Sequence, residues 1–285
     1  MISQEHFTLS SGIEIPKLGL GTWFIDDDKA AEAVREAVKL GYRHFDTAEA
    51  YGNERGVGEG VRSAPVPREE LFVTTKLAAE IKDYDGAVKA IDGSLMKAGL
   101  DYFDLMLIHS PQPWNDFRGG NYTEGNREAW RALEDACKAG KLKAIGVANF
   151  REEDIQSLTD AGMSRPMVNQ ILVHISNTPQ KLIDWCRKEN ILVEGYSPVA
   201  HGEILKNEAI KSMAKKYGVS TAQLCIRYDL QLGTLPLPKT VNPEHMKENM
   251  AVDFEIAEED MNVLRNFEPI KDYGEFTFFP VFSGK

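Results

Sequence analysis

Residues 17–47 run KLGLGTWFIDDDKAAEAVREAVKLGYRHFDT, and this stretch predicts a strand, a helix and a second strand. The outer segments, residues 17–22 and 42–47, are short and mostly apolar, which is typical of strands with both faces covered. Between them, residues 28–40 place apolar side chains at spacings of three and four, and Gly41 follows where a left-handed helix end favours glycine. The stretch therefore predicts one β-α-β unit with parallel strands.

The same alternation recurs along the chain until eight strands have been placed. The six further strands are expected at residues 71–76, 103–109, 144–149, 167–173, 192–196 and 234–239, with helical stretches such as 85–98, 126–139, 179–188 and 204–217 between them. Eight parallel strands that alternate with helices predict an α/β protein with a (β/α)8 TIM barrel. The alternative is an open doubly wound sheet, but no Gly-x-Gly-x-x-Gly opens a helix after the first strand, so a dinucleotide site of that kind is not indicated.

Two segments lie outside this alternation. Residues 7–15 form two alternating runs around Ser11-Gly12 and predict an N-terminal β-hairpin that closes the barrel bottom. Residues 268–285 carry one tyrosine and four phenylalanines without a helical period, so we expect a C-terminal loop that packs over the barrel mouth. No linker or internal repeat divides the chain, and residues 1–285 are expected to form one domain.

Composition and charge exclude several classes of function. The 285 residues include 33 Lys and Arg against 44 Asp and Glu, a formal net charge of −11 that disfavours binding to nucleic acid or to anionic membranes. No apolar run approaches the roughly 20 residues of a membrane span, and the first residues lack a signal-sequence pattern, which favours a cytoplasmic protein. No heptad pattern or apolar stripe indicates a partner, so we expect a monomer or a weak homo-oligomer.

The cysteines give no sign of a disulfide or a metal site. Cys137, Cys186 and Cys225 are far apart in the sequence and form no Cys-x-x-Cys pair. We expect them to be reduced packing residues. No other group of residues has the spacing of metal ligands, so no metal is predicted.

Polar side chains stand where seven of the strands end. In barrels of this type, the carboxyl ends of the strands and the loops after them carry the chemistry. These positions hold Asp46 with Tyr51 on the following loop, Lys76, His109, Asn149, Tyr196 followed by Ser197, and Lys239 followed by Thr240, and the strand at residues 167–173 contains Asn169 and Gln170. Each residue alone has an ordinary surface or structural explanation, but seven strand ends that point to one mouth indicate a common site.

Four of these residues make chemical sense together. A tyrosine phenol has an ordinary pKa near ~10, too high for an acid tuned to neutral pH. A nearby Lys76 ammonium would lower the pKa of Tyr51, and the Asp46 carboxylate would hold that ammonium in place. A neutral His109 could donate a hydrogen bond to a carbonyl oxygen. The set predicts a site that protonates an alkoxide as hydride reaches a carbonyl carbon.

The segments around these residues resemble the aldo-keto reductases. The match runs in order through Gly41-Tyr42-Arg43-His44-Phe45-Asp46-Thr47-Ala48-Glu49-Ala50-Tyr51-Gly52-Asn53-Glu54, Lys76, Leu107-Ile108-His109, Gly146-Val147-Ala148-Asn149-Phe150, Val168-Asn169-Gln170 and Pro238-Lys239-Thr240, and it spans essentially the whole barrel. Within the family the chain is most similar to microbial members of the 2,5-diketo-gluconate reductase and xylose reductase type. The resemblance implies an enzyme that reduces an aldehyde or ketone to an alcohol with NAD(P)H, by direct hydride transfer.

The resemblance also implies a role for each matching position. Tyr51 corresponds to the proton donor, Lys76 and Asp46 to the pair that tunes it, and His109 to the residue that orients the carbonyl. The implied cofactor-binding residues are Thr22, Trp23, Asp46, Asn149, Gln170 and Tyr196 at the nicotinamide end, Ser197 and Val199 near the pyrophosphate, and Lys239, Thr240, Val241, His245, Glu248 and Asn249 at the adenosine end. A small carbonyl substrate would be enclosed by Trp23 and Trp114 beside Tyr51 and His109.

His245 departs from the family pattern, because members that prefer NADPH usually carry Arg there. Arg is permanently charged and binds phosphate with two donors, whereas a histidine is largely neutral at pH 7. We therefore expect NADPH as the cofactor, with NADH also accepted. The alternative function is a non-catalytic module that binds a nicotinamide nucleotide on the same scaffold. The intact set of four argues against it, since a binding module needs no proton donor.

Overall fold

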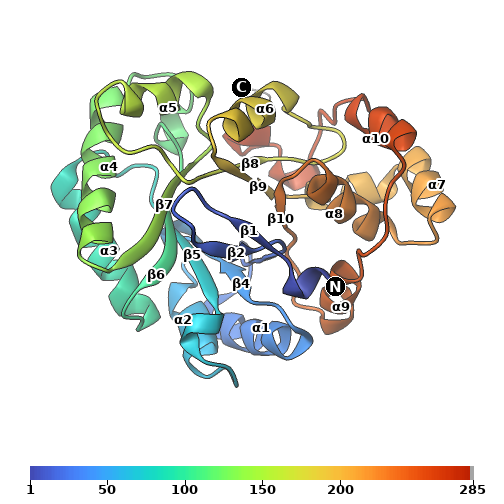
Figure 1. Ribbon diagram of the computed structural model, residues 1–285, viewed down its shortest axis with the longest axis horizontal. Helices are drawn as coiled ribbons and strands as arrows, with labels where there is room; N and C mark the ends of the chain where they lie inside the picture. The colour runs from blue at the N-terminus through green and yellow to red at the C-terminus, as the bar shows by residue number, and fades with distance from the viewer. Residues whose placement is uncertain (283–285) are drawn as a thin grey trace.

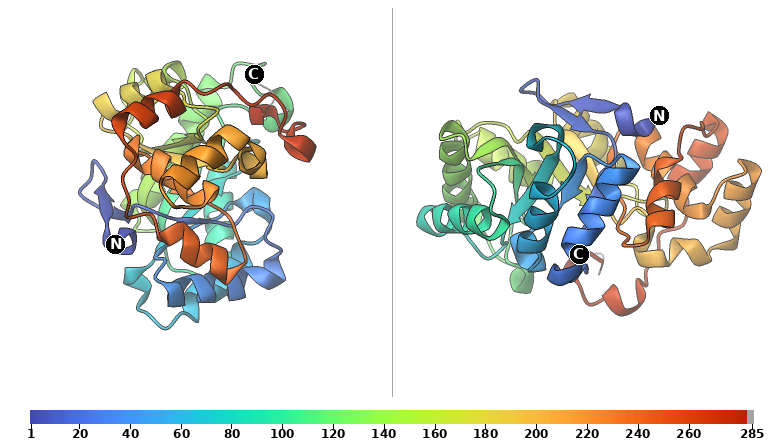
Figure 2. Two further views of the ribbon diagram at one scale, coloured as in Figure 1. Left: turned by 90° about the vertical axis from the view of Figure 1, so that its right-hand side faces the viewer. Right: turned by 90° about the horizontal axis from the view of Figure 1, so that it is seen from below.

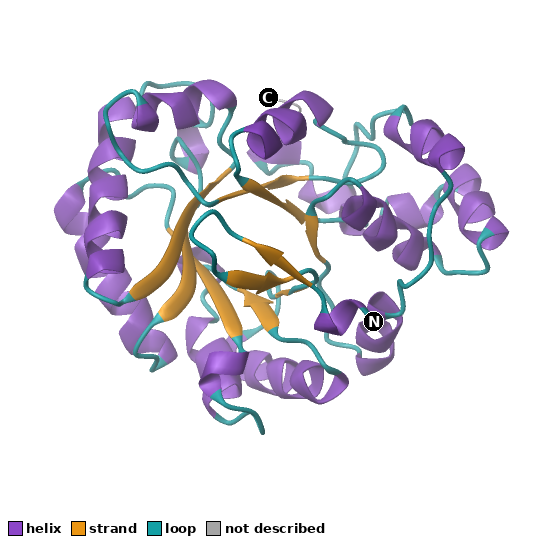
Figure 3. Ribbon diagram, in the orientation of Figure 1, coloured by secondary structure: helices purple, strands orange, loops and turns teal. Residues whose placement is uncertain are grey.

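Eight parallel strands form the centre of the molecule and helices surround them (Figures 1 and 3). The computed structural model describes residues 1–282. The strands are β3 (Leu20–Gly21), β4 (His44–Asp46), β5 (Phe72–Leu77), β6 (Phe103–Ile108), β7 (Leu142–Ala148), β8 (Val168–Leu172), β9 (Leu192–Tyr196) and β10 (Leu235–Leu237). They follow one another around the sheet in chain order, each parallel to the next. The eight predicted strands and the (β/α)8 barrel are confirmed.

Two glycines let the first and last strands of the barrel meet. The backbone N–H groups of Gly19 and Gly21 donate to the carbonyl oxygens of Pro236 and Pro238, at 3.2 and 3.0 Å. A Cβ atom at Gly19 would lie 2.5 Å from Cδ2 of Leu237 and 2.7 Å from Nδ1 of His44, so a larger residue would force these buried side chains to move. The backbone of β3 can therefore approach β10 and close the barrel.

The side chains of each strand alternate between the barrel interior and the surrounding helices. In β6, Leu105 and Leu107 belong to the interior cluster, whereas Met106 and Ile108 pack against the helical layer. Every one of these four side chains is fully buried. The continuous apolar runs in the sequence are explained by this burial on both faces.

A hairpin covers the amino-terminal end of the barrel. Strands β1 (His6–Thr8) and β2 (Glu14–Pro16) pair antiparallel, as predicted. Leu9 and Ile15 are buried with the interior cluster that includes Phe72 of β5 and Leu235 of β10. The hairpin thus closes the bottom of the barrel, which leaves the carboxyl ends of the strands as the open mouth.

The helical layer consists of ten α-helices among the described residues. They are α1 (Asp27–Leu40), α2 (Glu54–Arg62), α3 (Tyr84–Ala98), α4 (Thr123–Lys138), α5 (Glu152–Thr159), α6 (Gln180–Lys188), α7 (Glu208–Lys216), α8 (Thr221–Gln231), α9 (Pro243–Met250) and α10 (Glu258–Arg265). Gly41, predicted as a left-handed helix end, has positive φ, and so do Gly99, Gly140 and Gly218 after three further helical stretches. Pattern and local geometry agree at these ends.

One predicted helix is wrong as a single element. Residues 204–217 divide into a short 3-10 turn, η6 (Ile204–Lys206), and α7. The break falls at Asn207, whose side-chain oxygen accepts from the N–H groups of Ala209 and Ile210 at 3.0 and 3.2 Å. Asn207 therefore caps a new helix instead of continuing the old one.

The aromatic tail lies over the barrel mouth. After α10 it forms two 3-10 turns, η7 (Gly274–Phe276) and η8 (Pro280–Phe282), and Figure 2 (right) shows it on the side of the molecule opposite the N-terminal hairpin. The ring of Phe279 lies 5.3 Å from that of Trp23, centre to centre. The predicted C-terminal loop over the mouth is confirmed through residue 282, and its residues 283–285 lie outside the described residues. Within residues 1–282, every helix is too short or too polar to span a membrane.

Candidate active site

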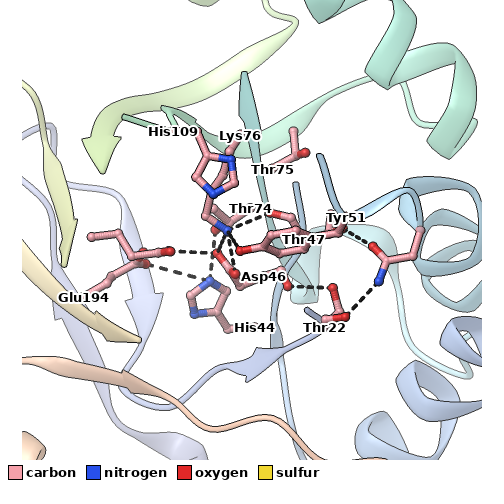
Figure 4. Close-up of polar contacts among 12 residues, drawn as sticks. Thr22, His44, Asp46, Thr47, Tyr51, Thr74, Thr75, Lys76, His109 and Glu194 are labelled. Atoms are coloured by element: carbon pink, nitrogen blue, oxygen red, sulfur yellow. Dashed lines mark hydrogen bonds and ion pairs between the residues drawn. The ribbon is translucent and has the colours of Figure 1, made fainter. Parts of the chain in front are cut away.

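The four residues singled out in the sequence come from three neighbouring strands. Asp46 ends β4, Lys76 lies in β5 and His109 directly follows β6. Tyr51 ends a 3-10 turn, η2 (Glu49–Tyr51), on the loop after β4. Because parallel strands present their carboxyl ends at the same edge, these side chains meet at the barrel mouth (Figure 4).

Lys76 is the centre of the cluster. Its Nζ atom lies 2.8 and 2.7 Å from the two carboxylate oxygens of Asp46, 2.9 Å from the carbonyl oxygen of Thr47 and 3.2 Å from the hydroxyl of Tyr51. The Lys76 side chain is completely buried and that of Asp46 nearly so. A buried ammonium with a carboxylate and two further oxygen partners is fixed in one geometry, and so is the phenol beside it.

The rings of Tyr51 and His109 face each other across the mouth. Their centres are 5.7 Å apart and the planes are inclined at 71°. Nδ1 of His109 is buried and has no hydrogen-bond partner within residues 1–282. The imidazole thus lines the cavity with a hydrogen-bonding capacity that no other group of the described chain uses.

The electrostatic setting keeps the two rings neutral. Burial, assisted by the Lys76 and Lys82 cations, holds the pKa of His109 well below its usual range. Burial also raises the pKa of Tyr51, against the lowering influence of Lys76. The expectation of a lowered Tyr51 pKa is wrong in net direction, because removing the phenol from water outweighs the ammonium and Asp46 adds to the rise. For Lys76, burial would lower the pKa, but Asp46 and Tyr51 together raise it and keep the amine charged.

A second polar layer lies beneath this cluster, and two of its members, His44 and Glu194, were not predicted as site residues from the sequence. Nε2 of Gln170 donates to Asp46 Oδ1 and to Glu194 Oε2, both at 2.8 Å. Burial raises the pKa of Glu194 to about 8, and burial lowers that of His44 to about 3. His44 donates to or accepts from Thr74 at 3.0 Å (Figure 4). A charged residue type inside an apolar strand, as at Glu194, is the signal that could have identified this layer.

A cavity of about 580 Å³ opens at the cluster. Beside Tyr51 and His109, one part of its wall is aromatic and consists of Trp23, Phe24, Trp114, Phe276, Phe279 and Phe282. The other part includes Asn149, Gln170, Tyr196, Ser197, Val199 and Lys239. The four predicted substrate residues and eight of the fourteen predicted cofactor residues thus line one continuous space, as expected for two ligands that must react with each other.

Trp114 belongs to the loop of residues 112–123, which we call the substrate loop. Its ring meets that of His109 nearly at right angles, with centres 5.3 Å apart, and lies 5.0 Å from that of Phe279. His201, which was not predicted from the sequence, stacks its ring on Phe276 at 4.0 Å and also lines the cavity. The aromatic wall is therefore built by the loop after β3, the substrate loop, the loop after β9 and the tail.

The polar wall has groups that suit the carboxamide of a nicotinamide. Asn149 donates to the carbonyl oxygen of His109 at 3.0 Å and accepts from the hydroxyl of Tyr196 at 2.7 Å. The side-chain oxygen of Gln170 lines the cavity without a hydrogen bond inside the described chain. Thr22 lies behind this wall and donates to the carbonyl oxygen of Asp46 at 2.9 Å. The fixed amides of Asn149 and Gln170, together with the Gln170 side-chain oxygen, suit a carboxamide, which is planar and both donates and accepts hydrogen bonds.

The residues predicted for the adenosine end lie along the segment after β10. Lys239 lines the cavity, and Thr240 accepts from the backbone N–H of Asn242, whose side chain caps α9. Val241, His245 and Glu248 are exposed, whereas Asn249 is buried. The structure places these residues at and beyond the cavity rim, with His245 accessible in the first turn of α9.

Comparison with known proteins adds to this geometry. Residues 17–268 match the family model described as "Aldo/keto reductase family". The chain is 39% identical over 261 residues to glyoxal reductase of Bacillus subtilis (strain 168), covering 91% of each, and 37% identical over 277 residues to methylglyoxal reductase DkgA of Escherichia coli O157:H7, covering 96% of this chain and 97% of the relative. A solved Bombyx mori aldo-keto reductase in complex with NADP superposes with a TM-score of 0.85 at 33% identity, over 98% of both chains.

Proposed function

Since this chain belongs to the aldo/keto reductase family, we propose that its cavity takes NADPH and a small carbonyl compound together, with Tyr51 as the proton donor. The protein is an NAD(P)H-dependent oxidoreductase that reduces carbonyl compounds. The observation that carries the proposal for the residues is the contact of one buried ammonium, Lys76, with both Asp46 and the Tyr51 hydroxyl at the open mouth.

Each of the four residues has a distinct task in this proposal. NADPH, when bound, supplies the hydride that reduces the carbonyl carbon. Tyr51 donates its proton to the carbonyl oxygen, and Lys76 stabilises the phenolate that remains. Asp46 keeps Lys76 charged and in place, as the two short contacts between them indicate. A neutral His109 donates a ring N–H to the same carbonyl oxygen and so orients the substrate.

The proposal for the cofactor follows from the polar wall and from the family resemblance. Asn149 and Gln170 would hold the carboxamide, and the Tyr196 ring would stack on the nicotinamide. The other residues proposed for the cofactor are Thr22, Trp23 and Asp46 near the nicotinamide, Ser197 and Val199 near the pyrophosphate, and Lys239, Thr240, Val241, His245, Glu248 and Asn249 near the adenosine. Neighbouring solved structures that contain NADP or NADPH support NADPH as the cofactor. NADH acceptance is proposed because a histidine stands at position 245.

A small carbonyl compound fits the enclosed aromatic part of the cavity, between Trp23 and Trp114. Two relatives are named as reductases of glyoxal and methylglyoxal, which supports small carbonyl compounds as substrates. We also infer that the hairpin, the barrel and the tail form one domain, because Leu9 and the Phe279 ring pack directly on the barrel.

The direct test is loss of nicotinamide absorbance when the purified protein is mixed with NADPH or NADH and a panel of aldehydes and ketones. We expect oxidation of NADPH that depends on the carbonyl compound, and slower but measurable oxidation of NADH. Tight NADPH binding without turnover across a broad panel would contradict the catalytic proposal and favour a binding module.

A further inference from the structure

Arg118 connects the substrate loop to the nicotinamide end of the cavity. Its side chain leaves the loop and reaches the start of the β7–α5 connection. There, Nη2 donates to the carbonyl oxygen of Asn149 at 2.8 Å, and Nη1 pairs with Oδ2 of Asp154 at 2.8 Å. Both charged side chains are only 15% exposed, so this contact is shielded from water on most sides.

Asn149 occupies a backbone conformation that its surroundings must hold. Its φ is +62°, a left-handed value that few residues other than glycine adopt. The backbone N–H donates to the Gln170 carbonyl oxygen at 2.9 Å, and the side-chain amide contacts His109 and Tyr196. Arg118 takes the remaining polar group, the Asn149 carbonyl oxygen, and so completes the restraint from the substrate side.

The same loop carries the aromatic ring that contacts His109. Trp114 lies four residues before Arg118, in the 3-10 turn η4 (Trp114–Asp116). Asp116 anchors the loop internally, since its carboxylate accepts from the hydroxyl of Tyr122 at 2.8 Å. Gly119 packs so closely on Asp116 that a Cβ atom there would lie 2.1 Å from the carboxylate. The Gly119-Gly120-Asn121 segment therefore belongs to an ordered turn that Arg118 ties to the barrel.

We propose that Arg118 is a positioning residue that couples the substrate loop to Asn149. The inference rests on the proposed function, in which Asn149 holds the carboxamide of the cofactor. Cofactor binding at Asn149 restrains the backbone whose carbonyl oxygen accepts a hydrogen bond from Arg118. The substrate loop and Trp114 therefore become more ordered when NADPH is bound. Coupling between two sites is reciprocal, and an ordered substrate loop therefore strengthens cofactor binding by the same factor.

The experiment compares Arg118→Met with Arg131→Met, a matched control. Arg131 also pairs with a carboxylate, Glu128, but on the exposed face of α4. NADPH affinity is measured by fluorescence titration, and hydrogen exchange of residues 112–123 is measured with and without saturating NADPH. The amides of Asp116 and Gly119 report on the loop, because each is hydrogen-bonded within it.

In the wild type and in Arg131→Met, we expect NADPH to slow exchange of these amides by at least about fivefold, the lower end of typical coupling between sites. In Arg118→Met, NADPH should slow exchange of these amides by less than about twofold. The NADPH dissociation constant should rise by at least about fivefold, because the coupling between the loop and the cofactor site is reciprocal and is lost in both directions. In steady-state assays, KM for the carbonyl compound should rise more than kcat falls, because the proton-transfer residues are unchanged.

Two further variants keep the inference testable if Arg118→Met does not fold. Arg118→Lys retains the positive charge but lacks the planar guanidinium whose two nitrogens contact Asn149 and Asp154. It should therefore recover only part of the coupling. Asp154→Asn keeps the shape but replaces the ion pair with a neutral hydrogen bond, and it should lie between the wild type and Arg118→Met. Equal NADPH-induced protection in the wild type and the Arg118 variants would overturn the inference while leaving the proposed function intact. A wild type that neither binds nor oxidises NADPH would overturn the proposed function itself.

Discussion

The Nζ atom of Lys76 lies 3.2 Å from the hydroxyl oxygen of Tyr51, with the amine completely buried. At this distance the amine donates to the phenol oxygen, and it would stabilise the phenolate left after proton transfer. Burial and Asp46 act in the opposite direction and keep the proton on Tyr51 until a substrate is present. The site therefore keeps the Tyr51 phenol protonated and places it beside the Lys76 ammonium, which would stabilise the phenolate formed by proton transfer.

Replacing Tyr51 with phenylalanine should remove proton donation without disturbing the cavity wall. We expect kcat for carbonyl reduction to fall by at least ~10²-fold, the usual contribution of a general acid, while NADPH binding stays nearly unchanged. Steady-state kinetics and a fluorescence titration of NADPH provide the two measurements. Phe279→Tyr is a suitable control, since it alters an aromatic wall residue outside the proton path. Retained activity in Tyr51→Phe would remove Tyr51 from the role of donor.

Removal of Lys76 should cost stability as well as activity, because Asp46 would remain buried without its cation. Breaking a buried ion pair from one side typically destabilises by about 3–5 kcal/mol. We expect Lys76→Met to show such a loss in urea unfolding, and the double variant Lys76→Met/Asp46→Asn to be more stable than Lys76→Met. The exposed Lys138, which pairs with Asp135, provides the control Lys138→Met. If the loss in free energy of unfolding of the double variant equalled the sum of the losses in the two single variants, the proposed interaction between Lys76 and Asp46 would be contradicted.

Glu194 should make the folded state less stable as the pH rises. Its pKa is about 8 in the folded protein against an ordinary value of 4.5, so the folded state binds one more proton between these values. The stabilising effect is complete below about pH 4.5 and is lost toward pH 8, with a slope of at most about 1.4 kcal/mol per pH unit.

Glu194→Gln removes this titration but keeps a side-chain oxygen for Gln170. The variant should therefore gain stability relative to the wild type between pH 6.5 and 8, where folded His44, with its pKa lowered to about 3, is neutral. Urea unfolding at several pH values measures the difference, and Glu128→Gln on the surface of α4 serves as the control. Parallel stability curves for wild type and Glu194→Gln would show that Glu194 is charged in the folded protein.

Cofactor selectivity should respond to position 245. Arg forms a charge-assisted pair with phosphate worth about 1.5–3 kcal/mol, which corresponds to roughly 10- to 150-fold in affinity. We expect His245→Arg to raise the preference for NADPH over NADH by at least about tenfold, measured as the ratio of kcat/KM values. His6→Arg on the exposed hairpin is the control. A wild-type NADPH preference above roughly a thousandfold would contradict relaxed selectivity, because a histidine lacks the forked, permanently charged donors with which arginine holds a phosphate.

The aromatic part of the cavity should discriminate against carboxylate substrates. No lysine or arginine lines that part among residues 1–282, and burial lowers the pKa of His201 to about 4, which leaves its ring neutral. We expect 4-carboxybenzaldehyde to be reduced with a kcat/KM at least about tenfold below that of 4-nitrobenzaldehyde, since an unpaired charge would be desolvated. Equal rates would indicate that the carboxylate stays in solvent or finds a cation when the tail moves.

The sequence by itself determined the barrel and the membership of the central cluster. Apolar runs and helical stripes report burial one element at a time, and glycines such as Gly41 mark helix ends through local backbone geometry. Asp46, Lys76 and His109 could be grouped because parallel strands present their carboxyl ends at one edge, whatever the details of packing.

Only the tertiary structure decided how those side chains meet and what surrounds them. Gln170 reaches Asp46 across 124 positions of sequence, and the contact exists because the barrel closes. The net rise in the Tyr51 pKa depends on water excluded by residues from several loops, and the link from Arg118 to Asn149 depends on the path of one loop. Local patterns carry information about neighbours three or four residues apart, whereas desolvation and long-range contacts are properties of the closed fold.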